Sequence, residues 1–172
     1  MNRAMSDLST GELRELYREL ILDHARSPRH FGKLPELTHS AEGLNPLCGD
    51  KLKLYLQIDD DDRISDAAFE GSGCAISVAS ASLMTDAIIG MRTGEALDFA
   101  KALIGAVTGR VSSEESGEES GEDLGEDSQI ELGKLQALQG VREFPSRVKC
   151  ATLAWHAMNS AIRQEQRPAS TE

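Results

Sequence analysis

The chain has 172 residues, of which 40% are hydrophobic and 27% are charged. This length accommodates one domain with a real core, and the composition is ordinary for a folded globular protein. No apolar run approaches the roughly 20 residues that span a bilayer, and residues 1–9 lack the apolar stretch of a signal peptide. We therefore expect a single domain over residues 1–172, cytoplasmic and without membrane association.

The acidic charge is concentrated in one segment. The formal net charge is -11, but residues 112–128 carry eight acids and no Lys or Arg, and removing the eight leaves -3. Leu124 is the one large apolar side chain in this stretch, so it has little to bury, and we predict a mobile acidic insertion. A docking surface for a basic partner is the alternative. No basic stripe indicates a nucleic-acid partner.

The first half of the chain predicts one helix followed by strands. Residues 10–26 place apolar side chains at the i, i+3, i+4 and i+7 spacing of an amphipathic helix. A short edge strand is predicted near residues 38–42. Residues 52–58 alternate between apolar and polar, and residues 63–70 provide a return strand with imperfect alternation that indicates a bulge.

The second half of the chain is mainly helical. Helices are predicted over residues 74–89 and 93–107, a short helix or turn over 130–138, and a last helix from about residue 145. Residues from about 168 are predicted to form a flexible tail. The expected fold is α+β, a small antiparallel sheet of about three strands with helices packed mainly on one face.

The same patterns predict whether the histidines, two methionines and Trp155 lie in the core or at the surface. The apolar stripes of the predicted helices include Met84, Met158 and Trp155, which we expect in the core. The four histidines are too scattered to form a site by sequence alone, and we predict surface or interfacial positions for His24, His30, His39 and His156.

The three cysteines occupy positions that favour thiolates. Cys48 lies in a Gly/Pro-rich loop, Cys74 follows Gly-Ser-Gly at a strand-to-helix junction, and Cys150 lies in the first turns of the last helix. Helix N-termini favour anions and lower thiol pKa values. Three thiols and the carboxylate of Asp50 make a candidate tetrahedral zinc site. Core packing is the ordinary alternative for each cysteine, and the spacings match no local zinc-finger signature.

Three motifs, read together, resemble the IscU/NifU-type iron–sulfur cluster assembly proteins. They are Asn-Pro-Leu-Cys-Gly-Asp at residues 45–50, Phe-Glu-Gly-Ser-Gly-Cys-Ala-Ile-Ser at 69–77, and Phe-Pro-Ser-Arg-Val-Lys-Cys-Ala-Thr-Leu-Ala-Trp at 144–155. IscU-type scaffolds are expected to carry a histidine immediately before the third cysteine, where this chain has Lys149. SufU-type proteins lack that histidine and carry an insertion between the middle helices and the last cysteine. Residues 109–130 form such an insertion here, so the resemblance is closest to the SufU branch.

The resemblance implies an IscU-like fold and a sulfur-carrying role. The partner would be a SufS-type cysteine desulfurase, a pyridoxal phosphate enzyme whose persulfide sulfur this sulfurtransferase-like carrier accepts and passes to downstream assembly proteins. Cys48 is the expected acceptor. Charge balance, apart from the resemblance, predicts that Arg147 and Lys149 support the site by offsetting its negative charge, and orienting a persulfide is the alternative role of Arg147. The implied ligands of Zn²⁺ are Cys48, Asp50, Cys74 and Cys150.

Two other roles stay open at this point. The same ligands would suit a scaffold on which a [2Fe–2S] cluster is assembled and transferred, so iron or a cluster is the alternative to zinc. A structural zinc domain, whose metal only supports folding, is the second alternative. The sequence leaves open the metal bound in the cell, the downstream sulfur acceptor, the oligomeric state and the role of the acidic repeat.

Overall fold

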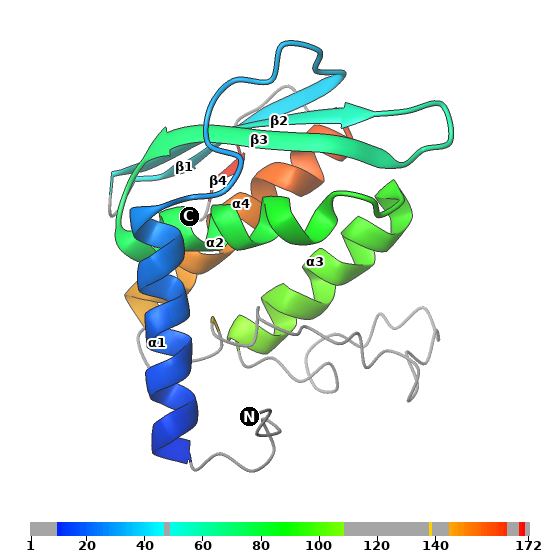
Figure 1. Ribbon diagram of the computed structural model, residues 1–172. Helices are drawn as coiled ribbons and strands as arrows, with labels where there is room; N and C mark the ends of the chain where they lie inside the picture. Colours follow the sequence, from blue (N-terminus) through cyan, green and yellow to red (C-terminus); the bar gives the residue numbers. More distant parts are fainter. Residues whose placement is uncertain (1–9, 47–48, 109–137, 139–144, 165–168, 171–172) are drawn as a thin grey trace, which may run out of the picture.

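The computed structural model (Figure 1) describes residues 10–46, 49–108, 138, 145–164 and 169–170. The predicted acidic insertion and Cys48 lie outside these residues, as does the short helix predicted over 130–138, apart from Leu138. The strands are β1 (His39–Asn45), β2 (Asp50–Ile58), β3 (Ile64–Ser72) and β4 (Ala169–Ser170). The helices are α1 (Thr10–Arg26), α2 (Ala75–Ile88), α3 (Thr93–Thr108) and α4 (Pro145–Ile162).

The sheet has the strand order β3-β2-β1-β4, in which β1, β2 and β3 pair antiparallel. Leu52, Leu54 and Leu56 alternate toward the core and are buried, as the period of two predicts. The register shifts between Gln57 and Ile58, in β2 opposite the return strand for which a bulge is predicted.

Both edges of the sheet are covered. The backbone of residues 30–32 lies along β3, where the Gly32 N–H donates to the Phe69 carbonyl at 2.8 Å. On the other edge, β4 pairs in parallel with β1 at Gly43 and Leu44. The sequence predicts a flexible tail from about residue 168, whereas Ala169 and Ser170 form this short strand because the edge of β1 offers unpaired backbone groups.

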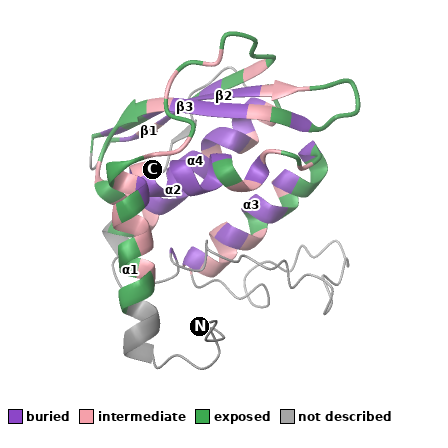
Figure 2. Cartoon of the chain, viewed as in Figure 1, coloured by how far each residue is buried: buried purple, intermediate pink, exposed green. Residues whose placement is uncertain are grey.

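The helices pack on one face of the sheet (Figure 1). α4 contacts β1 and β2, α2 contacts β3, and α1 and α3 pack in turn on α2 and α4. The buried residues gather where these helices face the sheet (Figure 2). The predicted α+β fold, with a small antiparallel sheet and helices mainly on one face, is confirmed.

The core between α2 and α4 is centred on Trp155. This indole is fully buried, stacks on Phe99 at a centroid distance of 5.7 Å and donates from Nε1 to the Ser80 Oγ at 3.1 Å. Met84 and Met158 are also fully buried, which confirms the predicted core positions. Among the described helices, none is both long and apolar enough to cross a membrane.

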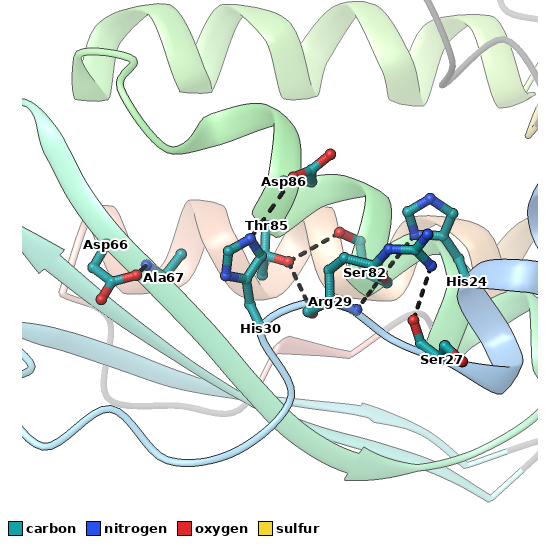
Figure 3. Close-up of polar contacts among 9 residues, drawn as sticks. All are labelled: His24, Ser27, Arg29, His30, Asp66, Ala67, Ser82, Thr85 and Asp86. Atoms are coloured by element: carbon teal, nitrogen blue, oxygen red, sulfur yellow. Dashed lines mark hydrogen bonds and ion pairs between the residues drawn. The ribbon is translucent and has the colours of Figure 1, made fainter.

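The prediction of a surface or interfacial position is wrong for His24. Its side chain is 3% exposed, and Nδ1 lies 2.7 Å from the Ser82 Oγ (Figure 3). The same Ser82 hydroxyl accepts the Arg29 backbone N–H at 2.8 Å. The ring is buried because α1 packs against α2, whose small side chains leave space and supply a polar partner. Burial also lowers the pKa of His156, which is only partly exposed.

Candidate metal centre

Three of the four predicted ligands lie together at one end of the sheet. One ligand atom each from Asp50, Cys74 and Cys150 lies within 4.8 Å of the other two. Asp50 and Cys150 are buried and Cys74 is half-buried, so the cluster has one accessible side. Cys48 lies outside the described residues. These three residues come from three different elements, which pack together only in the folded chain.

The β1–β2 hairpin places Asp50. Asn45, the last residue of β1, pairs with Asp50, the first residue of β2. Gly49 precedes Asp50 with φ +71°, in the left-handed region that glycine adopts without steric cost. The hairpin therefore delivers the Asp50 carboxylate to a fixed point beside the start of α2.

The start of α2 places Cys74. Cys74 is the N-cap residue of α2, with extended backbone angles, and its side chain makes no capping hydrogen bond. Its backbone N–H donates instead to the Asp50 Oδ1 at 3.0 Å. The thiol is therefore not used to cap the helix, and the N-terminus of α2 lies next to the negative charge of the carboxylate, which a helix N-terminus stabilises.

Gly73 allows the Asp50 carboxylate to approach the chain before α2. A Cβ atom at Gly73 would lie 2.5 Å from the Asp50 Oδ1 and 3.0 Å from its Cγ, both closer than van der Waals contact. The last glycine of the Gly-Ser-Gly sequence is therefore explained by the space that the carboxylate occupies. The sequence indicated a turn at this point but not this contact.

The variant Gly73→Ala tests this requirement. We expect the new methyl group to displace the Asp50 carboxylate and to lower zinc affinity by at least about 10-fold. This is the smallest effect usual for the loss of a group that orients a metal ligand. Gly94→Ala in α3 is the matched control, because a Cβ there would meet nothing within 4 Å. Competition with a chromophoric chelator measures both affinities, and equal affinity in the two variants would contradict the prediction.

Asn45 is a residue of the site that the sequence reasoning missed. It is 1% exposed, and its Nδ2 donates to the Asp50 Oδ2 at 3.2 Å and to the Cys150 Sγ at 3.6 Å. Its Oδ1 is buried, with no hydrogen-bond partner among the described residues. The sequence signal for this role was the position of the Asn45 amide, five residues before Asp50 and opposite it across a tight hairpin.

Arg147 supplies positive charge at the accessible side of the cluster. It is exposed, three residues before Cys150 in α4. The charge of the Cys74 thiolate, followed by a hydrogen bond to Cys150, raises the pKa of the Arg147 guanidinium above its usual value. Its role in offsetting the negative charge of the cluster stays a prediction. Lys149 is half-buried in the same turn.

The donor set of the cluster fits zinc. Thiolates and carboxylates are zinc ligands at about 2.3 Å and about 2.0–2.2 Å, so ligand atoms around one tetrahedral ion lie about 3.5–3.8 Å apart. The three described ligand atoms are within 4.8 Å of one another, so small side-chain movements bring them to these distances. A tetrahedral site requires one ligand more than these three.

Comparison with known proteins assigns the chain to a family. The model of the NifU-like N-terminal domain matches residues 16–151, so the chain belongs to this family. A relative from Bacillus subtilis (strain 168), the zinc-dependent sulfurtransferase SufU, is 40% identical over 156 residues, which cover 91% of this chain and 95% of the relative. The iron–sulfur cluster assembly scaffold protein IscU of Streptococcus pyogenes serotype M1 is 38% identical over 157 residues, covering 91% and 89%.

A solved structure from Fervidobacterium islandicum AW-1 has the same fold. It is described as an iron–sulfur cluster assembly scaffold protein for the SUF system, with 33% sequence identity and a TM-score of 0.71 over 87% of this chain and 98% of that chain. The chain is thus a member of the SufU and IscU group of iron–sulfur cluster assembly proteins. Its relatives include both a sulfurtransferase and scaffolds.

Proposed function

We propose that this protein is a zinc-dependent sulfur acceptor, which takes persulfide sulfur from a SufS-type cysteine desulfurase for iron–sulfur cluster assembly. The observation that carries the proposal is the convergence of Asp50, Cys74 and Cys150 within 4.8 Å. In this proposal Cys48 is the fourth zinc ligand and also the sulfur acceptor. The zinc-dependent relative, at 40% identity, supports the same assignment.

The proposed sulfur transfer is a thiol–disulfide type of exchange. The Cys48 thiolate attacks the terminal sulfur of the desulfurase persulfide, a new S–S bond forms on Cys48, and the desulfurase cysteine leaves as a thiolate. No oxidant is needed, because the sulfane sulfur moves without a net change in oxidation state. Bound zinc would keep the thiols deprotonated without redox chemistry of its own.

Arg147 and Lys149 have a supporting role in this proposal. Three thiolates and a carboxylate around Zn²⁺ leave a net negative charge, which these two cations and the N-terminus of α2 reduce. Arg147 is exposed beside the thiols, so it is also available to the incoming persulfide, which is an anion.

The second candidate function is a scaffold that assembles and transfers a [2Fe–2S] cluster. The observation in its favour is the 38% identity to a relative named as an iron–sulfur cluster assembly scaffold. Lys149 argues against it, because it stands where scaffolds of the IscU type are expected to have a histidine ligand. The third role, a purely structural zinc site, predicts metal binding without any effect on the desulfurase.

Metal analysis of protein purified without added metal separates the first two roles. The proposal predicts colourless protein with about one zinc ion per chain, and no such zinc in a Cys150→Ser variant. Iron together with acid-labile sulfide and visible absorption, lost in the same variant, would overturn the sulfur-acceptor proposal in favour of the scaffold.

A further inference from the structure

We infer that Asn45 is a positioning residue, whose buried amide group holds Asp50 and Cys150 in the arrangement that binds the metal. The inference rests on the proposed zinc site and adds a residue outside the predicted ligand set. Asn45 donates from one nitrogen to two ligand atoms, the Asp50 Oδ2 at 3.2 Å and the Cys150 Sγ at 3.6 Å. It thereby links the β1–β2 hairpin to α4.

The orientation of the amide follows from its neighbours. A carboxylate and a thiolate both accept hydrogen bonds, so the NH₂ group of Asn45 is the end of the amide that suits them. Turned by 180°, the amide would direct its oxygen at two negatively charged acceptors. In the observed orientation Oδ1 is buried with no partner among the described residues.

The Asp50 carboxylate is held at both of its oxygens. Oδ1 accepts the Cys74 backbone N–H at 3.0 Å, and Oδ2 accepts from Asn45. Each carboxylate oxygen can accept at two positions, so the bonds from the described donors leave one lone pair on each oxygen for a metal ion. Asn45 and the Cys74 backbone therefore fix the rotation of the carboxylate without using up its capacity as a ligand.

These bonds give the three described ligands a common framework. Asp50 is tied to the backbone of Cys74 and, through Asn45, to Cys150. In the proposed function one ligand must leave the metal to act as a nucleophile, while the others retain it. The framework assigns the role of retaining the metal to Asp50, Cys74 and Cys150, because hydrogen bonds within the protein connect them.

The test compares the zinc affinity of the full-length protein with that of Asn45→Leu and Asn45→Ala. Leucine keeps the branched shape of asparagine with a somewhat larger volume but donates no hydrogen bond, whereas alanine removes both volume and donor. We expect both variants to bind zinc about 10–100-fold more weakly than the wild type in chelator competition. With Co²⁺ in place of zinc, we also expect the thiolate-to-cobalt absorption band to shift, because one thiolate loses an N–H donor.

Thr93→Val is the control, since it removes another hydrogen bond of a buried side chain, the partly buried bond to Asp62, without contact with the cluster. It should leave the zinc affinity and the cobalt spectrum unchanged. Wild-type affinity and spectrum in Asn45→Leu would show that Asn45 only fills space and would overturn the inference, with the proposed function intact. If the wild type binds no zinc, or if Cys150→Ser binds it equally well, the zinc site itself is wrong. Asn45→Ala gives the comparison if the leucine variant does not fold.

Discussion

Replacing Cys48 with alanine is expected to reduce the stimulation of a SufS-type desulfurase to background, a loss on the order of 100-fold or more. The loss is large because removing the attacking thiolate leaves no group to accept the sulfane sulfur. The measurement is desulfurase turnover with cysteine as substrate, at saturating zinc, together with mass spectrometry of the sulfur carrier. Wild-type protein should gain the mass of one or more sulfur atoms, and Cys48→Ala should not.

The control for this experiment separates sulfur transfer from folding. Asp50, Cys74 and Cys150 are unchanged in Cys48→Ala, so zinc content and circular dichroism show whether the rest of the site persists. Ser40→Ala, on an exposed position of β1, should behave as the wild type. Unchanged stimulation by Cys48→Ala would show that Cys48 is not the acceptor. Zinc-bound wild-type protein that gives no stimulation of the desulfurase would favour the purely structural zinc domain.

Removing zinc is expected to lower the thermal unfolding midpoint by about 5–16 °C. A ligand that binds only the folded state at 100–1,000 times its dissociation constant contributes about 2.7–4.1 kcal/mol, and each kcal/mol shifts the midpoint by about 2–4 °C at this chain length. Zinc at this site would bind only the folded state, because the residues that hold it come from β2, the start of α2 and α4. Scanning calorimetry before and after chelation measures the shift.

Cys150→Ser is the matched variant for the calorimetric experiment. Cys150 is fully buried, and serine removes the thiolate with little change in volume. Its unfolding midpoint should lie near that of the zinc-free wild type and should not respond to chelation. An equal response in wild type and variant would mean that the stabilising metal binds elsewhere in the chain.

Much of the fold was predictable because its elements have strong periodic patterns. The helix predicted over residues 10–26 coincides with α1, and the alternation at residues 52–58 identified the buried face of β2. β4 was not predictable, since two residues carry no period and their pairing depends on the free edge of β1. The burial of His24 was likewise hidden, because it depends on a hydroxyl supplied 58 residues later by Ser82.

The meeting of Asp50, Cys74 and Cys150 was predictable from the sequence, but the groups that hold them were not. Cysteines at a loop and two helix starts, with Asp50 beside the first, pointed to a metal. The resemblance to a family then joined motifs that no local spacing connects. Asn45 and Gly73 act through contacts across the hairpin and at the start of α2, so their roles became visible only in three dimensions.

The connection between the last two helices has a consequence for how the chain can vary. α3 ends at Thr108 and α4 begins at Pro145, so 36 residues join them, and Cys150 lies just beyond this join. Leu138 lies within this connection and is fully buried in the core, so the chain is anchored to the fold before it reaches α4. Sequence changes between α3 and Leu138 can therefore leave the delivery of Cys150 by α4 unaltered.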